Sequence, residues 1–395
     1  MGSWPPIASE TREWVSKFSA DQLTRMQSQT FRGPYEATVV PLIAALEPEI
    51  DGALAAEVED ASTALVRFDS ELGSLSMPFA AILLRSESAS SSQIEQLTSG
   101  ARAIAEAELG ERETGNGALI VRNVRALQAA LDLVDSIDAA GIIAMQHALL
   151  GAHAPHLTGG FRDEQVWIGG SAAGPHTAVF VAPHHERVPA AIDDLLAFVR
   201  RDDIPVLSQA AIAHAQFETI HPFPDGNGRT GRALVQAVLR QKGLTANVTV
   251  PVSAGLLQDV DSYYAALTSY RSGDIRPIIN AFTNASFRAI TNGRIMTAEI
   301  TQARDTWNER MGSLRIDAAA RRVAALALEQ PVLNQRLISE RMRVSPMTAY
   351  RALEALESRG VLRAANSAKR NRIWIADDVI AALDAFAARA GRRVR

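Results

Sequence analysis

The sequence predicts a mainly α-helical protein of more than one domain, with one small β-hairpin near its middle. Apolar residues recur every three or four positions through most of the 395 residues, which is the period of an amphipathic helix. Over 165–183, β-branched and aromatic residues are separated by Gly and Pro instead, which is typical of a hairpin. A chain of this length exceeds one ordinary hydrophobic core, so we expect two or three domains.

Composition narrows the class of protein. Apolar residues make up 47% of the chain, enough for substantial cores. The absence of Cys excludes disulfides and thiolate metal sites, which fits a reducing compartment. The start of the sequence lacks the order of a signal peptide, and no apolar run approaches the roughly 20 residues that span a bilayer. We therefore expect a cytoplasmic protein with no membrane contact.

Charge is unevenly distributed along the chain. The net charge is −4, yet residues 315–395 carry 16 Lys and Arg against 8 Asp and Glu. The preceding 314 residues must then carry −12. Such a shift predicts a separate C-terminal module with a different kind of partner.

Helical spacing accounts for most of the first three quarters of the chain. A short helix is expected around Trp14 and Phe18, and a long one over 35–75, where Leu42 and Leu46 share a face. After Pro78 the pattern resumes. Further helices are expected from Phe79, over 118–135, 138–151, 188–199 and 205–220, from Asn227 to the stop at Gly243, and over 277–301.

The stretch from His221 to Arg232 holds the densest chemistry in the chain. It reads His-Pro-Phe-Pro-Asp-Gly-Asn-Gly-Arg-Thr-Gly-Arg. Pro222 and Pro224 exclude helix from its first residues, so a loop is expected before the helix that begins at Asn227. Free N–H groups at the start of such a helix, with the helix dipole behind them, bind anions such as phosphate.

The side chains of this stretch suit the same ligand. Gly226 and Gly228 allow the backbone to approach phosphate oxygens closely. Arg229 and Arg232 share one face of the helix, so both can bind successive phosphates. The alternative is a surface loop with a capping Asp or Asn and two solvated arginines.

Two further groups would complete a reactive site. Asp225 offers a hard oxygen ligand for Mg²⁺, and His221 offers a proton acceptor for an incoming hydroxyl. With them, the stretch resembles the Fic (filamentation induced by cAMP) signature, His-Pro-Phe-x-Asp/Glu-Gly-Asn-Gly-Arg-x-x-Arg, and matches every fixed position. The resemblance implies a Fic-type helical core and transfer of AMP from ATP to a hydroxyl side chain of a target protein.

The resemblance also implies roles by position. His221 would be the general base, and Asp225 the ligand of Mg²⁺. Phe223 would be a buried anchor, and Arg229 and Arg232 would orient the β- and γ-phosphates. The nucleotide-binding loop would be completed by Gly226, Asn227, Gly228, Thr230 and Gly231, with Asn227, Gly228 and the adjoining amides as the anion hole for the α-phosphate.

Other functions stay open at this point. The signature fixes a diphosphate rather than a base, so transfer of phosphate, UMP or phosphocholine is one alternative. A transcription regulator whose core only senses nucleotide is another. A homodimer is also left open.

A serine-rich stretch at 88–96 resembles the inhibitory motif of the same family, Ser/Thr-x-x-x-Glu-Gly/Asn. Ser91 and Glu95 occupy the fixed places, whereas Gln96 departs from the usual Gly or Asn. The resemblance implies that Glu95 pairs with Arg232 and blocks productive ATP binding. In relatives this glutamate can also position water to remove AMP. The alternative is a solvated Glu95.

The hairpin at 165–183 resembles the Fic flap, whose edge aligns a target peptide by strand addition. Val179 and Phe180 of this flap are expected against the nucleotide. Tyr263 and Tyr264 match a pair that lies by the adenine, although core packing of one is the alternative. A weaker match places Arg271 near the nucleotide. The histidines at 147, 184, 185 and 214 are expected to be surface, loop or structural residues rather than metal ligands.

The last part of the chain resembles a winged helix-turn-helix. Helices are expected over 318–329, 334–341 and 346–358, followed by a strand over 370–375. Met347, Thr348, Tyr350 and Arg351 would start the recognition helix, with Lys369, Arg370 and Arg372 on or beside the wing. Such a module contacts DNA, or another protein. We expect domains at 1–115, 116–314 and 315–395.

Overall fold

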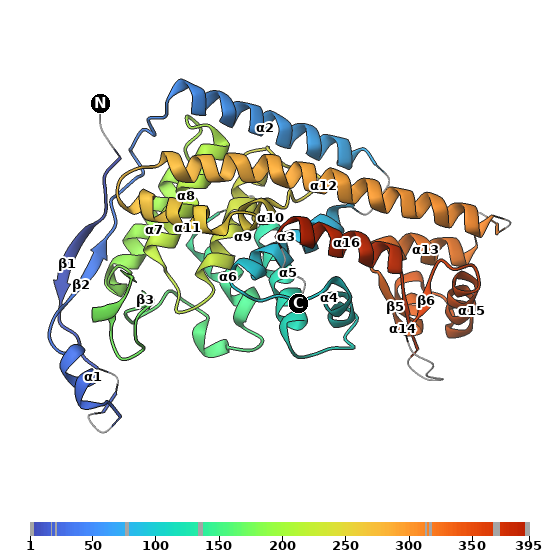
Figure 1. Ribbon diagram of the computed structural model, residues 1–395, viewed down its shortest axis with the longest axis horizontal. Helices are drawn as coiled ribbons and strands as arrows, with labels where there is room; N and C mark the ends of the chain where they lie inside the picture. Colours follow the sequence, from blue (N-terminus) through green and yellow to red (C-terminus); the bar gives the residue numbers. More distant parts are fainter. Residues whose placement is uncertain are drawn as a thin grey trace. The chain divides into compact units, whose positions relative to one another are not determined.

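The computed structural model describes residues 4–16, 18–19, 22–75, 79–132, 137–312, 314–315, 318–365 and 372–391. Most of them are helical, as the sequence predicts, and the strands are short (Figure 1). They group into two compact units, one of residues 1–63, 126–244 and 259–284 and one of residues 64–125, 245–258 and 285–395. The expected division at 115 and 314 stays a prediction.

The first unit contains two hairpins and a helical core. Its elements are β1 (Ala8–Arg12), α1 (Arg25–Thr30), β2 (Tyr35–Val39), α6 (Ala139–Leu150), β3 (Trp167–Ile168), β4 (Phe180–Val181), α7 (Val188–Val199), α8 (Val206–Ile220), α9 (Asn227–Gln241) and α11 (Val260–Arg271), with 3₁₀ turns η1 (Pro155–Leu157), η2 (Pro175–Thr177) and η3 (His185–Arg187). Three helices have some residues in the first unit and the rest in the second: α2 (Gly52–Gly73), α5 (Asn116–Asp132) and α12 (Arg276–Met311).

Helices α8 and α9 form the centre of the first unit. Every residue of α8 from Leu207 to Ile220 is buried. Several of them are alanines, which allow close approach of neighbouring helices. A side chain at Gly231 of α9 would place its Cβ 3.0 Å from Phe217 Cδ1, so only Gly fits this contact without a shift. The loop between the two helices is therefore anchored on both sides by tight packing.

The N-terminal part of the chain differs from the sequence expectation. Residues 35–39 form strand β2 rather than helix, paired antiparallel with β1 from Ala8↔Val39 to Arg12↔Tyr35. Pro34 and Pro41 flank a run rich in β-branched residues, which favours a strand there, and the helix begins only at Gly52. The helix expected around Trp14 is also wrong, because α1 starts after Thr24, which forms a capping box with Gln27.

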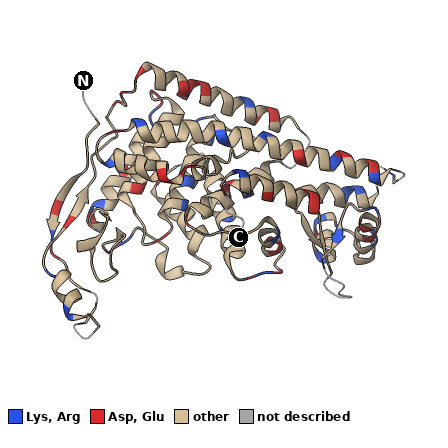
Figure 2. Cartoon of the chain, in the orientation of Figure 1, with Lys and Arg blue, Asp and Glu red and all other residues tan. Residues whose placement is uncertain are grey.

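Helix α2 shows the amphipathic pattern that the sequence predicts. The apolar side chains that it buries recur every three or four residues, and its Asp and Glu positions, red in Figure 2, are exposed except for Asp69. The buried apolar positions are Leu54, Val58, Ala61, Leu65, Phe68 and Leu72. None of the helices in the described part of the chain has the length and hydropathy of a membrane span.

The second unit holds the serine-rich stretch and the C-terminal module. Its elements are α3 (Phe79–Ile94), α4 (Ala101–Glu108), α10 (Val252–Leu257), α13 (Ala319–Glu329), β5 (Val332–Asn334), α14 (Gln335–Met342), α15 (Pro346–Glu357), β6 (Arg363–Ala364), β7 (Ile373–Ile375) and α16 (Asp377–Arg389). The three strands form an antiparallel sheet in the order β5-β7-β6. Helix α16 was not expected from the sequence.

Serines of the second unit lie inside the protein rather than in a loop. Residues 86, 88, 90, 91 and 92 are all buried in α3. The Nδ2 atom of Asn123 donates to the Ser88 carbonyl oxygen and to Ser92 Oγ, both at 2.9 Å. The buried Glu87 carboxylate accepts from the N–H and the hydroxyl of Ser253 at 2.8 and 2.6 Å. Polar groups of α3 are thus satisfied by protein partners, which makes their burial tolerable.

Candidate functional site

The C-terminus of α8 places His221 in an uncommon backbone conformation. His221 has φ 51° and ψ 61°, and its N–H donates to the Phe217 carbonyl oxygen at 2.9 Å. Only Gln96, His221 and Arg343 combine a side chain with positive φ among the described residues. Pro222 follows and cannot continue a helix. The chain therefore turns sharply at His221, at a cost of about 1–3 kcal/mol that the surrounding structure must offset.

The His221 imidazole is oriented by the last turn of α8. Its Nδ1 lies 3.4 Å from the main-chain oxygen of Glu218 and 4.0 Å from Glu218 Oε2. A proton on Nδ1 faces these oxygens, which leaves Nε2 as the basic nitrogen. Glu218 is buried, and it was not among the residues expected in the site from the sequence. Its position three residues before His221 on one helix was the available signal.

The loop after His221 is closed by one side-chain amide. Asn227 Oδ1 accepts from the Phe223 N–H at 2.9 Å, and Asn227 Nδ2 donates to the Phe223 carbonyl oxygen at 2.8 Å. Phe223 itself is fully buried, with ring centroids 5.6 Å from Phe161 and 6.4 Å from Phe217. The Asn227 side chain thus holds the loop together, and its main-chain N–H stands at the start of α9.

The start of α9 has the features of an anion-binding helix terminus. Its N-cap, Gly226, has φ 85° and no side chain that could cap the helix. The first intrahelical hydrogen bond joins the Thr230 N–H to the Gly226 carbonyl oxygen at 2.9 Å. A Cβ at Gly226 would lie 3.0 Å from Leu149, so the chain needs Gly here for both conformation and space. Main-chain N–H groups at such a terminus attract negative charge.

Charged side chains surround this terminus. The Asp225 side chain is 58% exposed, and its Oδ1 lies 3.7 Å from Nη2 of the buried Arg229. Arg232 is also buried and lies three residues after Arg229 on α9. Two guanidinium groups near the positive end of a helix dipole favour a ligand with several negative charges.

The tyrosine pair divides into one buried and one exposed ring. Tyr263 is 2% exposed, and its hydroxyl lies 2.7 Å from Nε2 of the buried His214. Burial, and then the nearby Arg232 charge, lower the pKa of His214 to about 3, so it stays neutral near pH 7. Tyr264 is 46% exposed. Of the pair, Tyr264 presents an exposed ring for stacking, and contact with the adenine stays a prediction for both.

The 165–183 segment forms the expected hairpin. Strands β3 and β4 pair antiparallel, with Trp167 opposite Val181 and Ile168 opposite Phe180. Val179 is 86% exposed, whereas Phe180 is buried with the Arg271 guanidinium 3.7 Å from its ring centroid. The structure thus brings together two of the residues expected near the nucleotide.

The second unit contains the two residues of the expected inhibitory motif. Ser91 is buried in α3, and Glu95 is exposed in the turn that follows the helix. Gln96, at the place where the family motif has Gly or Asn, adopts a left-handed conformation with φ 63°. The pairing of Glu95 with Arg232 stays a prediction.

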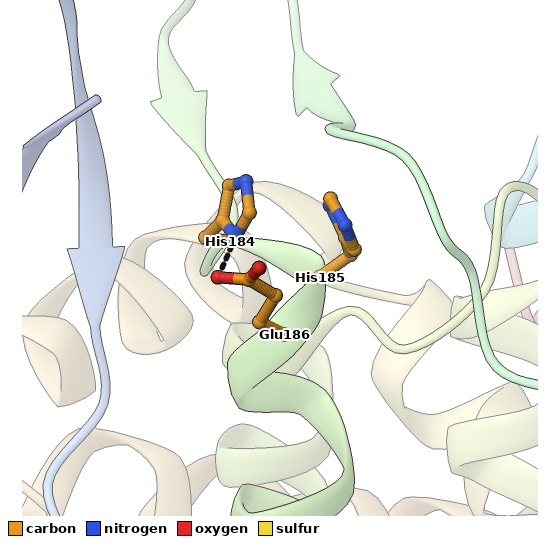
Figure 3. A group of neighbouring side chains, drawn as sticks. All are labelled: His184, His185 and Glu186. Atoms are coloured by element: carbon orange, nitrogen blue, oxygen red, sulfur yellow. Dashed lines mark ion pairs between the residues drawn. The ribbon is translucent and has the colours of Figure 1, made fainter. Parts of the chain in front are cut away.

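Three consecutive residues just before α7 have side chains of the types that can bind a metal ion. The ligand atoms of His184, His185 and Glu186 all lie within 4.8 Å of one another (Figure 3). Glu186 Oε2 lies 3.2 Å from His184 Nδ1 and 3.4 Å from Nη1 of Arg12. A metal ion would compete with that guanidinium for the same carboxylate. The interpretation of these residues as loop histidines stays a prediction.

The three helices expected in the C-terminal module are present as α13, α14 and α15, and β7 lies within the expected strand, whereas the assignment as a winged helix stays a prediction. Ser345 caps α15, and Met347, Thr348 and Arg351 are exposed along its first turns. Lys369 and Arg370 lie outside the described residues. Arg372 pairs with Glu357 at 2.7 Å and stacks over Trp374, so part of the expected wing contacts its own domain.

Comparison with known proteins provides evidence that does not depend on the geometry of the site. Residues 136–239 match the family model of the Fic/DOC family. The chain is 31% identical over 182 residues to "Protein adenylyltransferase Fic" of Nematostella vectensis, which covers 43% of this chain and 40% of that protein. It is 30% identical over 148 residues to "Protein adenylyltransferase fic-1" of Caenorhabditis elegans, which covers 37% of this chain and 26% of that protein. The chain therefore spans less than half the length of these relatives.

One solved structure supports the fold. A Fic family protein from Desulfovibrio desulfuricans G20 superposes with a TM-score of 0.54 at 21% identity, over 84% of this chain and 98% of that one. The likeness extends well beyond the residues matched by the family model.

The loop closure gives a direct prediction. Asn227→Ala removes both hydrogen bonds to Phe223 and leaves its buried main-chain groups unsatisfied, so we expect a loss of about 1–3 kcal/mol of unfolding free energy. Urea titration followed by circular dichroism measures it. Asn284→Ala, which removes an exposed amide on α12, is the matched control and is expected within about 0.5 kcal/mol of wild type. Equal effects of the two changes would contradict a role for Asn227 in closing the loop.

Proposed function

Residues 136–239 match the Fic/DOC family, and on that premise we propose that this chain is a protein adenylyltransferase acting on Ser, Thr or Tyr hydroxyls. The observation that carries the proposal is the loop of residues 221–232, where an oriented imidazole precedes an uncapped helix terminus with two arginines. The names of the relatives, which state adenylyl transfer, support it. ATP is the substrate in this proposal.

The loop residues suit an in-line displacement. The hydroxyl oxygen of the target attacks the α-phosphorus and forms a new oxygen–phosphorus bond, while the bond to the bridging oxygen of the β-phosphate breaks. Pyrophosphate leaves with that electron pair, and Nε2 of His221 accepts the hydroxyl proton. Catalysis then depends on positioning and on neutralising phosphate charge, because the protein forms no covalent intermediate.

The rest of the site binds the triphosphate. Main-chain N–H groups from Asn227 onward receive the α-phosphate, and Arg229 and Arg232 receive the β- and γ-phosphates. Asp225 would hold Mg²⁺, which when bound neutralises part of the phosphate charge. The donor fits, because Mg²⁺ takes about one or two protein carboxylates together with substrate phosphates, and Asp225 is exposed beside the helix terminus.

The hairpin is the proposed platform for the target. An extended segment that carries the hydroxyl would add to its edge through main-chain hydrogen bonds, which select for an extended backbone more than for a sequence. The target protein is therefore not specified by these residues. A cytoplasmic location and a homodimer also stay predictions.

Transfer of a different phosphate-containing group is the main alternative to AMP transfer. Transfer of phosphate, UMP or phosphocholine would use the same diphosphate contacts. The mass added to a modified protein separates these groups, since each has its own mass.

His221 provides the first test. We expect His221→Ala to reduce AMP transfer by about 10²–10⁴-fold because the general base is lost. ATP binding by calorimetry is expected to persist, because the phosphates contact the start of α9. His147→Ala on α6, an exposed histidine beside Thr158, is the matched control and is expected to keep full activity. Transfer at the wild-type rate by His221→Ala would remove His221 from this role.

Autoinhibition is a second proposal. Glu95 would pair with Arg232 and compete with the γ-phosphate for its guanidinium, and it would also allow removal of AMP by water. Glu95 lies in the turn that directly follows α3, at the fixed place of the family motif.

The test of autoinhibition uses a single substitution. We expect Glu95→Gly to raise auto-modification, seen as added AMP in intact-mass analysis with ATP and Mg²⁺, by about 5- to 150-fold. Glu113→Gly, an exposed loop carboxylate of the same unit, is expected to change nothing. An unchanged rate for Glu95→Gly would refute the inhibitory pairing.

The C-terminal module supports a further role in binding DNA, with or without a nucleotide-sensing function of the core. Arg341, Arg343 and Arg351 lie exposed on and beside α14 and α15, and none forms an ion pair with another described residue. Exposed arginines around the first turns of a recognition helix suit phosphate contacts. A protein partner is the alternative.

Salt dependence tests DNA binding in the full chain. We expect the chain to shift duplex DNA in a gel, with an affinity that falls as the salt concentration rises. Arg351→Ala is expected to reduce the slope of log K against log salt by about one. Arg304→Ala on α12, which removes an arginine paired with its neighbour Asp305, is the control and is expected to keep the slope. Absence of any salt-dependent shift at micromolar protein would favour a protein partner.

A further inference from the structure

One buried arginine joins the turn at His221 to the base of the hairpin. Arg162 lies between η1 and β3 and is 4% exposed. Its Nε donates to the His221 carbonyl oxygen at 2.8 Å, and its Nη1 donates to the Glu164 carbonyl oxygen at 2.8 Å. Its Nη2 donates to the carbonyl oxygens of Pro183 and Ile220. The sequence shows this residue only as part of a Gly-Gly-Phe-Arg turn.

All of these acceptors are main-chain oxygens. Two of them, from Ile220 and His221, belong to the C-terminal end of α8, where carbonyl groups lack helical partners and carry the negative end of the dipole. A guanidinium group donates hydrogen bonds to these carbonyl groups, and its positive charge interacts favourably with the negative end of the helix dipole. Burial lowers the pKa of Arg162 to about 10, so the charge persists at neutral pH. The Arg162 N–H also donates to the Pro222 carbonyl oxygen at 2.9 Å.

The hairpin end of this contact is equally well fixed. Pro183 lies two residues after the end of β4, and the preceding Ala182 oxygen accepts from Nε2 of Gln165 at 2.7 Å. The buried hydroxyl of Tyr35 holds Gln165 in turn at 2.9 Å. The guanidinium group therefore connects two segments that both act on the target hydroxyl in the proposed reaction. One carries the base, and the other aligns the target hydroxyl.

The conformation of His221 explains why such a contact is needed. Left-handed backbone at a residue with a side chain is unfavourable, so the direction of the imidazole depends on neighbouring groups that hold the turn. Pro222 and the loop closure by Asn227 act on the following residues, and Arg162 acts on the His221 peptide itself.

We propose that Arg162 is a positioning residue that fixes the His221 turn and the base of the hairpin in one arrangement, so that base and target hydroxyl meet at the α-phosphate. The proposal rests on the proposed adenylyl transfer. The hydrogen bonds of Arg162 within the described residues go to carbonyl oxygens at 164, 183 and 220–222 rather than to the α9 terminus. Its loss is therefore expected to affect the alignment of the reacting groups rather than the binding of ATP. Misplacement of about 1 Å at a reacting centre reduces rates by roughly 10²-fold.

The experiment compares three variants of the full chain, each in the Glu95→Gly background so that transfer is measurable if autoinhibition operates. Arg162→Met removes all donors, and Arg162→Lys keeps the charge but not the fork geometry. Arg201→Met is the matched control, because Arg201 likewise donates to main-chain oxygens of the first unit, those of Ala44 and Leu46. The readouts are kcat and KM for ATP, and hydrogen exchange of residues 178–186 and 219–229.

We expect kcat to fall by about 10- to 100-fold in Arg162→Met with KM for ATP within about threefold of its parent, and partial recovery in Arg162→Lys. Exchange should accelerate in both segments for Arg162→Met and in neither for Arg201→Met. If Arg162→Met does not fold, the Lys variant decides by the same two readouts.

Unchanged exchange in 219–229, or a kcat within about twofold of the parent, would overturn the proposal if seen in folded Arg162→Met, or in Arg162→Lys where the Met variant does not fold. Absence of AMP transfer by the parent protein would instead count against the proposed function. The exchange measurement would then still decide whether Arg162 holds the two segments.

Discussion

The turn that joins α8 to α9 is the constraint on which the rest of the site depends. Two helices meet there with opposite ends, so carbonyl groups of α8 and N–H groups of α9 face the same loop. The negative end of α8 receives the Arg162 guanidinium. The positive end of α9 is left without a capping side chain at Gly226. One short loop thus separates a satisfied helix terminus from one suited to an anion.

Packing keeps this loop in place. Gly231 allows α9 to contact Phe217 of α8, and Phe223 fills the interior beneath the loop. Asn227 then fixes the Phe223 main chain from the first turn of α9. Since each of these groups is buried, the orientation of His221 does not depend on flexible surface side chains. Preorganisation of this kind is what a transfer reaction without a covalent intermediate requires.

Local signals made the centre of the site predictable from sequence. The loop and the two helices around it follow from Pro222, Pro224 and the glycines, and the hairpin follows from its punctuated β-branched runs. Partners distant in sequence made the rest unpredictable. Arg162 binds carbonyl oxygens, which leave no trace in residue type, and the serines of α3 are buried because Asn123 and neighbouring groups satisfy them. Strand β2 required its pairing with β1.

The most direct test of the central claim is a crystal structure of the chain with Mg²⁺ and an ATP analogue whose α,β-bridge cannot be cleaved. We expect the phosphates along the first turn of α9, with His221 Nε2 facing the α-phosphorus and Asp225 at the metal. A nucleotide bound elsewhere, or a first turn of α9 filled by side chains that leave no room for a triphosphate, would contradict it.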